Sequence, residues 1–290
     1  MVKRDGRGLL AFCYIMILIV SISVVLPFLN IISIAFSSYE SSIKNPMMIF
    51  PKDLDFTAFR LILENSILMK SYENTIIVTI IGTLLGVALT VATAYPLSRK
   101  RFRGKKLVMN MIIFTMIFNG GLIPNFYLIR GLGLLDSLWA LIIPGALTAY
   151  NIILTKSFFE GIPEELEEAA RIDGATDFDV LTRVILPLSG PIVATITLFS
   201  AVSHWNSFFN AVIYIRDSAK WTLQLVLREI LLSANNQLLQ SGGNAAEMAS
   251  VPLKNINYAT IVVVILPILC LYPFLQKYFV KGIMIGAVKG

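Results

Sequence analysis

The sequence predicts an all-α protein that crosses a membrane several times, and three observations support this fold class. Hydrophobic residues make up 56% of the 290 residues, charged residues only 14%, and the mean hydropathy is +0.76. Soluble domains carry about 25% charged residues because they need a hydrated surface. Six stretches contain no Lys, Arg, Asp or Glu, and each can cross a bilayer core about 30 Å thick. Backbone groups in a bilayer must be hydrogen-bonded internally, so each stretch is expected to be a helix.

The predicted spans form one transmembrane domain over residues 1–290. They cover 9–36, 74–98, 107–129, 137–155, 184–215 and 255–276. The first is too long for the apolar core of a signal peptide, so we predict an uncleaved anchor. Residues 119–121 and Pro124 interrupt the third span, where we favour a bend over a break that lines a cavity. Gly82 and Gly86 in the second span predict close packing against another helix.

Cations in the short connections predict the orientation. Lys3, Arg4 and Arg7 lie at the N-terminus, and residues 99–106 contain six cations and no acid. Because Lys and Arg are retained in cytoplasmic loops, both chain termini and the loop at 156–183 are predicted to be cytoplasmic. This topology explains the basic run without nucleic acid as a partner. One His and two Cys form no cluster that predicts a metal site.

The loop at 156–183 departs from the positive-inside pattern, with three cations and eight acids. Pro163 favours the first turn of a short helix and Gly174 its end, and a second helix is expected from Thr176 or Asp177. Leu166, Ala169 and Ala170 share one small apolar face, and Glu167 can pair with Arg171. Helices that lie on lipid prefer cations and bulky apolar residues. We therefore expect this helix to dock on another protein.

The spacing of this loop resembles the EAA loop of ABC importer permeases. Glu168-Ala169-Ala170 is followed after three residues by Gly174, and after nine more by Val184-Ile185-Leu186-Pro187, with Val184 where the pattern has isoleucine. The surrounding residues 158–166 and 172–175, together with 204–209 and 281–290, resemble the maltose-type carbohydrate permeases. The resemblance covers essentially the whole chain and implies the fold of a type I ABC importer permease.

The resemblance also implies partners and site residues. In that family the loop docks as a coupling helix in a cleft of a cytoplasmic ATPase subunit, and the C-terminal tail reaches the ATPase pair. The implied partners are a second homologous permease, two copies of the ATPase that binds ATP and Mg, and an extracytoplasmic sugar-binding protein. The implied location is the cytoplasmic membrane of a prokaryote. Implied contacts with the ATPase are Glu165, Leu166, Glu168, Ala169, Ala170, Asp173, Gly174, Leu186 and Pro187 in the loop, and Gly286, Lys289 and Gly290 in the tail.

The chain itself contains no G-x-x-x-x-G-K-[ST] phosphate-binding loop. We therefore expect a transport subunit without cofactor, and no enzyme. An intramembrane serine protease would need a nucleophilic Ser with a base, and no such motif surrounds the single histidine, His204. A stand-alone carrier or channel for a neutral solute is the main alternative, and it leaves the acidic loop unexplained. A membrane scaffold without transport activity is the plainest alternative.

A candidate solute path lies in the fifth span. The six stretches lack Asp, Glu, Lys and Arg, which argues against proton or sodium coupling and favours a neutral, polyhydroxy solute. On a continuous helix, Trp205 and Phe209 share one face and Asn206 and Asn210 the neighbouring one. Aromatic faces beside amides suit a sugar, and the family resemblance favours an oligosaccharide. Helix packing is an equally weighted alternative. The candidate path residues are His204, Trp205, Asn206, Phe209 and Asn210.

Overall fold

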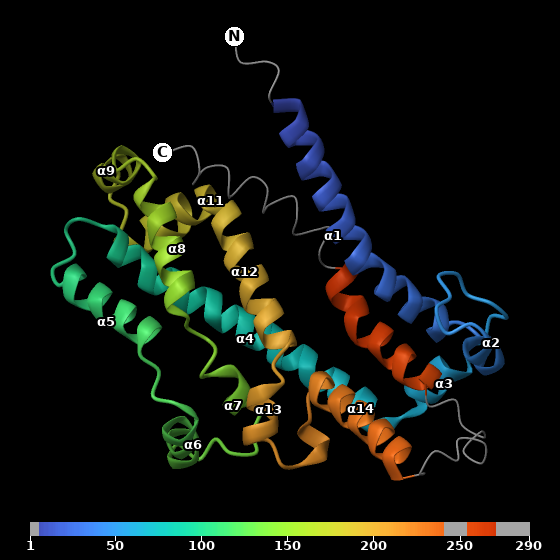
Figure 1. Ribbon diagram of the computed structural model, residues 1–290. Coiled ribbons are helices and arrows are strands. Elements are labelled where there is room, and N and C mark those ends of the chain that lie inside the picture. Colours follow the sequence, from blue (N-terminus) through green and yellow to red (C-terminus); the bar gives the residue numbers. More distant parts are fainter. Residues whose placement is uncertain (1–5, 241–253, 271–290) are drawn as a thin grey trace. The chain divides into compact units, whose positions relative to one another are not determined.

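The computed structural model describes residues 6–240 and 254–270, and helices dominate this part of the chain (Figure 1). The chain divides into two compact units. Unit 1 comprises Met1–Met69 and Leu227–Leu266, and unit 2 comprises Lys70–Val226 and Pro267–Gly290. Within the described ranges the extended structure is limited to one isolated antiparallel bridge between Ser37 and Leu54. The predicted all-α class is therefore confirmed for these ranges.

Unit 1 contains the first helices of the chain. These are α1 (Gly6–Ala35), α2 (Tyr39–Lys44) and α3 (Thr57–Glu64). The side chains of residues 8–29 in α1 are all exposed and almost all apolar, as expected of a helix that faces lipid or another protein. At the end of α1, the Asn255 amide donates hydrogen bonds to the carbonyl oxygens of Ile34 (3.2 Å) and Ser37 (2.7 Å).

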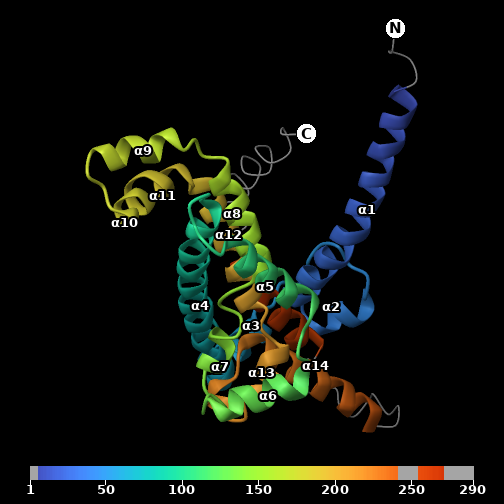
Figure 2. The same ribbon diagram turned by 90° about the vertical axis from the view of Figure 1, so that its left-hand side faces the viewer.

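Unit 2 is built around α4 (Ser66–Ser98), most of which belongs to it. The short elements that precede α12 lie at one end of unit 2, and α6, α7 and α13 lie at its other end (Figure 2). The remaining helices are α5 (Lys105–Ile117), α6 (Leu122–Gly131), α7 (Trp139–Ile142), α8 (Ala149–Glu160), α9 (Glu165–Ile172), α10 (Asp177–Asp179), α11 (Leu186–Leu188), α12 (Gly190–Trp205), α13 (Phe209–Tyr214) and α14 (Leu223–Gln240), which ends in unit 1.

Among the described residues, two helices, Gly8–Ala35 and Ser66–Ser98, are long and apolar enough to cross a membrane in one piece. Two more candidates are bent pairs: Lys105–Ile117 with Leu122–Gly131 turns by 116°, and Asp177–Leu188 with Gly190–Trp205 turns by 85°. The described part of the last predicted span is the helix Lys254–Cys270. The number of six spans and the location of the termini stay predictions.

Three predicted spans are not continuous helices, and in the fourth and fifth this corrects the sequence-based prediction. The fourth, 137–155, contains α7, a turn and the first half of α8, because Pro144 and Gly145 end the helix. The fifth, 184–215, is interrupted at 206–208, between α12 and α13. The third turns at 118–121, where Gly121 has a φ of 85°, which confirms the bend predicted there. Apolar length alone does not reveal such breaks.

Close packing around α4 is confirmed at both glycines. A Cβ atom on Gly82 would lie 2.6 Å from Nε2 of His204, and one on Gly86 would lie 2.8 Å from the carbonyl oxygen of Ala146. A Cβ on Gly145 would lie 3.4 Å from Cε1 of the same histidine. The buried His204 ring therefore packs closely against the backbones at Gly82 and Gly145.

We expect Gly82→Ala to destabilise unit 2 by about 1–3 kcal/mol, the usual result of overpacking a tight contact. The new methyl group would overlap the His204 ring, which the Gly145 backbone holds from another side. Thermal unfolding of the purified chain in detergent measures the effect. Gly190→Ala on α12 is the matched control, because a Cβ there meets nothing within 4 Å. Equal unfolding temperatures for the two variants would contradict the tight contact.

Candidate functional site

The α9 helix begins and ends at local sequence signals. It follows Pro163, it has Glu164 at its N-cap, and its first turn is acidic, which suits the positive end of the helix dipole. Gly174 ends it with a φ of 86°. The Ala175 amide then donates to the carbonyl oxygen of Ala170 at 3.0 Å, which is the hydrogen bond of a Schellman motif. The predicted short helix with its terminal glycine is therefore confirmed.

The second turn of the loop is fixed by a capping box. The Thr176 hydroxyl oxygen accepts from the Asp179 amide at 3.3 Å, and the Asp179 carboxylate accepts from the Thr176 amide at 3.1 Å. From there α10, a π-helical segment (Val180–Ile185) and α11 follow without interruption. This helix begins where the sequence predicts, and the π-helical segment carries it on to Leu188.

One face of α9 and the start of α10 expose apolar side chains. Leu166 is 44% exposed, Ile172 86% and Phe178 73%, and Ala169 lies on the same exposed face. Exposed carboxylates surround them. We name this set the α9 surface: Leu166, Ala169, Ile172 and Phe178, with Glu165, Glu168 and Asp173. Unpartnered apolar side chains of this size on a short helix indicate an interaction site.

Sequence reasoning placed Ala170 on the same face as Leu166 and Ala169, and the structure corrects this. Ala170 is half-buried and packs against the hydrophobic cluster that contains Phe159 and Val180. Ile172 and Phe178 were missed. Ile172 follows Ala169 by three residues, so the helical repeat could have identified it. Phe178 carries no such signal, because it lies beyond the turn at Gly174 and outside the repeat of α9.

Leu186 and Pro187 lie apart from the α9 surface. Leu186 packs against the same hydrophobic cluster, and Pro187 is exposed within α11, just before the chain bends by 85° into α12. The contact of these two residues with the ATPase stays a prediction. The tail residues Gly286, Lys289 and Gly290 lie outside the described residues.

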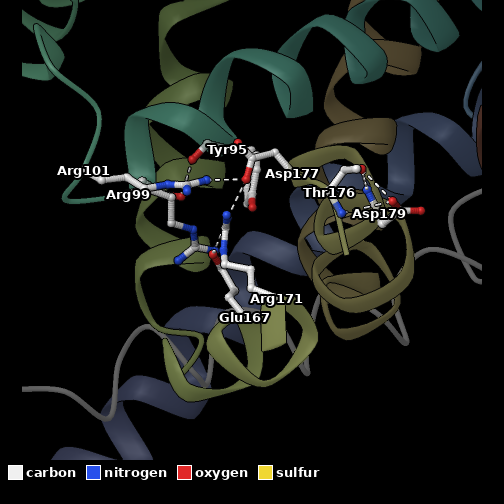
Figure 3. A network of polar contacts seen from close by, with 9 residues as sticks. Tyr95, Arg99, Arg101, Glu167, Arg171, Thr176, Asp177 and Asp179 are labelled. Atoms are coloured by element: carbon white, nitrogen blue, oxygen red, sulfur yellow. Dashed lines mark hydrogen bonds and ion pairs between the residues drawn. The ribbon is translucent and has the colours of Figure 1, made fainter. Parts of the chain in front are cut away.

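A buried ion pair joins α9 to the end of α4 (Figure 3). Glu167 pairs with Arg99, which follows the last residue of α4, and both side chains are only 7% exposed. The Arg99 guanidinium also lies 5.2 Å from the centre of the Tyr95 ring and donates to the carbonyl oxygen of Phe159 at 3.3 Å. We call Arg99 and Glu167 the buried pair.

A second, more exposed ion network continues from the buried pair (Figure 3). Asp177 accepts hydrogen bonds from Arg101 and from Arg171, the latter at 2.6 Å. The Arg101 hydrogen bond, followed by that of Arg171, lowers the pKa of Asp177 below its usual value. Arg171 lies 4.0 Å from Glu167, so the pair predicted from their spacing is present but long. The closer partner of Glu167 is Arg99, which is distant in sequence.

Farther along unit 2, a small polar cavity opens beside the junction of α12 and α13. Its volume is about 160 Å³. It is lined by four of the five predicted path residues, His204, Asn206, Phe209 and Asn210, together with Leu141, Gly145, Ser203, Ser207 and Phe208. The predicted pairing of faces on a continuous helix is wrong, because residues 206–208 separate the two helices. Trp205 is buried and packs edge-to-face on Tyr72, with ring centres 5.9 Å apart.

A second cavity, the aromatic cavity, adjoins the polar cavity through Gly145 and Ser203, which line both. Its volume is about 350 Å³, and its other lining residues are Thr148, Tyr150, Asn151, Phe199 and Ser200. The rings of Tyr150 and Phe199 lie 6.1 Å apart at 45°. The lining of both cavities therefore combines aromatic rings, amides and hydroxyls and includes no Asp, Glu, Lys or Arg. Across the described residues, no three His, Cys, Asp or Glu side chains are grouped to hold a metal ion.

Comparison with known proteins gives concordant matches. The family described as "Binding-protein-dependent transport system inner membrane component" matches residues 82–285. The chain is 43% identical over 266 residues to protein LplC of Bacillus subtilis, covering 92% of this chain and 90% of LplC. It is 41% identical over 280 residues to the polygalacturonan/rhamnogalacturonan transport system permease protein YtcP of the same organism, covering 96% of each.

A solved structure is also similar to the chain. It is a crystal structure of a bacterial ABC transporter involved in the import of the acidic polysaccharide alginate. A chain of that transporter matches with a TM-score of 0.86 and 36% sequence identity, over 96% of this chain and 99% of that chain. At this identity and coverage, the likeness extends to the sequence as well as the fold.

Proposed function

We infer the function from the family to which the chain belongs, the binding-protein-dependent transport system inner membrane components, in which it is a permease subunit of a carbohydrate ABC importer. It is located in the cytoplasmic membrane as a multi-pass protein. Three further points are proposals: how ATP hydrolysis in the ATPase drives movement of this chain, which solute the chain transports, and where the solute passes.

The proposed coupling site is the α9 surface, and its proposed occupant is a cytoplasmic ATPase subunit. The observation that carries this proposal is the exposed apolar set around Ala169 and Ile172, inside the EAA spacing and surrounded by carboxylates. Small and medium side chains allow a groove to approach closely, and an acidic rim complements a basic one. The end of unit 2 that carries α9 is then the cytoplasmic end, as the cations at 99–106 also predict.

The proposed solute is an oligosaccharide, and the proposed path includes the polar and aromatic cavities. The named substrates of YtcP and of the alginate transporter are polysaccharides, which supports a solute of linked sugars. Sugar rings stack on aromatic faces, and their hydroxyls exchange hydrogen bonds with amides and hydroxyls such as those of Asn151, Ser203 and Asn206. The assembly would add a second homologous permease, two ATPase copies that bind ATP and Mg, and an extracytoplasmic sugar-binding protein.

Reconstitution in liposomes tests this function. The chain, the second permease, the ATPase and the sugar-binding protein are expected to import the oligosaccharide that the binding protein holds, and only when ATP is present on the ATPase side. The chain contains no phosphate-binding loop, so its energy source must be the separate ATPase. Uptake is measured as labelled sugar retained in the vesicles.

The control is the same complex with an ATPase that binds ATP but does not hydrolyse it, which should import nothing. The alternative of a stand-alone carrier or channel predicts the opposite pattern. If liposomes containing this chain alone equilibrate the sugar down its gradient, the ATP-driven function is wrong.

A further inference from the structure

The buried pair is distinguished from the other ion pairs in the described ranges by its burial. Both Arg99 and Glu167 are 7% exposed. In each of the other pairs at least one side chain is 30% or more exposed. Exposed pairs contribute about 0–1 kcal/mol, since water and salt screen them. A buried pair behaves differently, because neither charge can exchange its partner for water.

Stability does not account for the presence of such a pair. Replacing a buried ion pair by apolar residues of similar volume is often neutral or stabilising, by about 1–4 kcal/mol, because two charges no longer need to be desolvated. What the charges provide is a strong contact with a defined direction. A packed apolar surface can slide, whereas a guanidinium and a carboxylate in direct contact resist displacement.

The surroundings of Arg99 hold the guanidinium in place. The carboxylate of Glu167 lies on one side, the Tyr95 ring lies 5.2 Å from the guanidinium carbon, and the carbonyl oxygen of Phe159 accepts a hydrogen bond at 3.3 Å. Tyr95 belongs to α4 and Phe159 to α8. The cation therefore joins α9 to the ends of two longer helices.

The position of Glu167 on α9 is relevant to how a movement of α9 passes to α4. Glu168 and Ala169 are exposed on the α9 surface, whereas the adjacent Glu167 faces the interior of unit 2. A partner that binds the α9 surface can move α4 through the contacts that α9 makes with the end of α4. Two ion pairs are among these contacts: Lys100 pairs with Glu164 in solvent, and the buried pair is the one shielded from water.

We propose that Arg99 and Glu167 are positioning residues that fasten α9 to α4, so that a displacement of α9 by the ATPase is passed to the transmembrane helix. This proposal rests on the proposed docking of the ATPase on the α9 surface. The exposed network of Arg101, Arg171 and Asp177 lies beside the buried pair and braces the turn that follows α9.

The first test replaces the pair by apolar residues of similar length, Arg99→Met with Glu167→Leu, in the complete transporter. Neither buried charge is then left without a partner, so the complex is expected to assemble and to hydrolyse ATP. Sugar imported per ATP hydrolysed is expected to fall about 5-fold or more, within the range of coupling between protein sites. Import per ATP equal to that of the unaltered complex would overturn the proposal. The control is Lys70→Met with Glu73→Leu, which removes an exposed ion pair of α4 and should change nothing.

The second test separates a link from a merely structural role. Arg99→Cys with Glu167→Cys is made in a chain whose exposed cysteines, Cys13 and Cys270, are changed to Ser. Import per ATP is expected to be low, and a short thiol-reactive crosslinker between the new cysteines is expected to restore it. A structural role predicts no gain on crosslinking, so a crosslinked complex that stays uncoupled would overturn the proposal.

The two tests also distinguish this inference from the proposed function. If Ala169→Arg on the α9 surface leaves import intact, the ATPase does not dock at α9. The Arg99–Glu167 contact then has no ATPase movement to transmit. If Ala169→Arg blocks import but the apolar pair transports normally, docking holds and only the link is wrong.

Discussion

The substitution Ala169→Arg is expected to abolish ATP-driven import while the chain remains folded in the membrane. Ala169 is exposed at the centre of the α9 surface, so a partner that covers Leu166 and Ile172 must also approach the Ala169 methyl group. A long cation there blocks that approach and opposes a basic partner. Substitutions at the centre of an interface commonly weaken binding by about 2 kcal/mol or more, which is roughly 30-fold.

The helix itself should tolerate the change. Arg is a good helix former, and at position 169 it can pair with Glu165 one turn earlier. Two measurements check the expectation: the amount of ATPase that co-purifies with the permease in detergent, and ATP-dependent sugar uptake in liposomes. Both are expected to fall together.

Ala219→Arg is the matched control, because Ala219 is an exposed alanine in the helical turn Ser218–Lys220, away from α9 in sequence. It receives the same added volume and charge, and it should leave ATPase binding unchanged. Full recovery of the ATPase with Ala169→Arg would show that the subunit docks elsewhere, and the proposed coupling site would have to be abandoned.

The loop around α9 could be predicted from sequence because its signals are local. Pro163, Gly174 and the Thr176 capping box act over a few residues, so their effect does not depend on the rest of the fold. The difference between the buried Glu167 and the exposed Glu168 could not be predicted, because it depends on contacts that are not local. The two acids are adjacent in sequence, and only the position of Arg99, contributed by a distant helix end, shows which of them is buried.

The breaks in the fourth and fifth predicted spans were hidden for another reason. Hydropathy measures whether a stretch can lie in a bilayer, and it ignores whether the helix is continuous. Pro144 and Gly145 were readable as breakers, but the apolar residues around them favoured one span. At 206–208 the break carries Asn206 into the polar cavity and leaves Trp205 packed on Tyr72, so a pattern that assumed one helix assigned the wrong faces.

The substitution Ser203→Trp is expected to reduce sugar import by about tenfold or more, which corresponds to about 1.4 kcal/mol in the barrier to passage. Ser203 lines both the polar and the aromatic cavities, and its side chain is exposed. An indole ring at this position occupies the junction of the two cavities and also removes a hydroxyl. The α9 surface is untouched, so the ATPase should still co-purify.

Two controls isolate the blocking effect, and uptake in liposomes with the complete complex is the measurement. Ser203→Ala removes the hydroxyl without filling space, and it should lower import far less than the Trp variant. Val212→Trp adds the same bulk at an exposed position of α13 that lines neither cavity. If the Ser203→Trp complex imports at the unaltered rate, the cavities are not the path. If the second permease no longer co-purifies with the Ser203→Trp chain, Ser203 belongs to a packing surface and the cavities are not the path. If import alone is lost, the sugar passes beside the break between α12 and α13, where the polar and aromatic cavities meet.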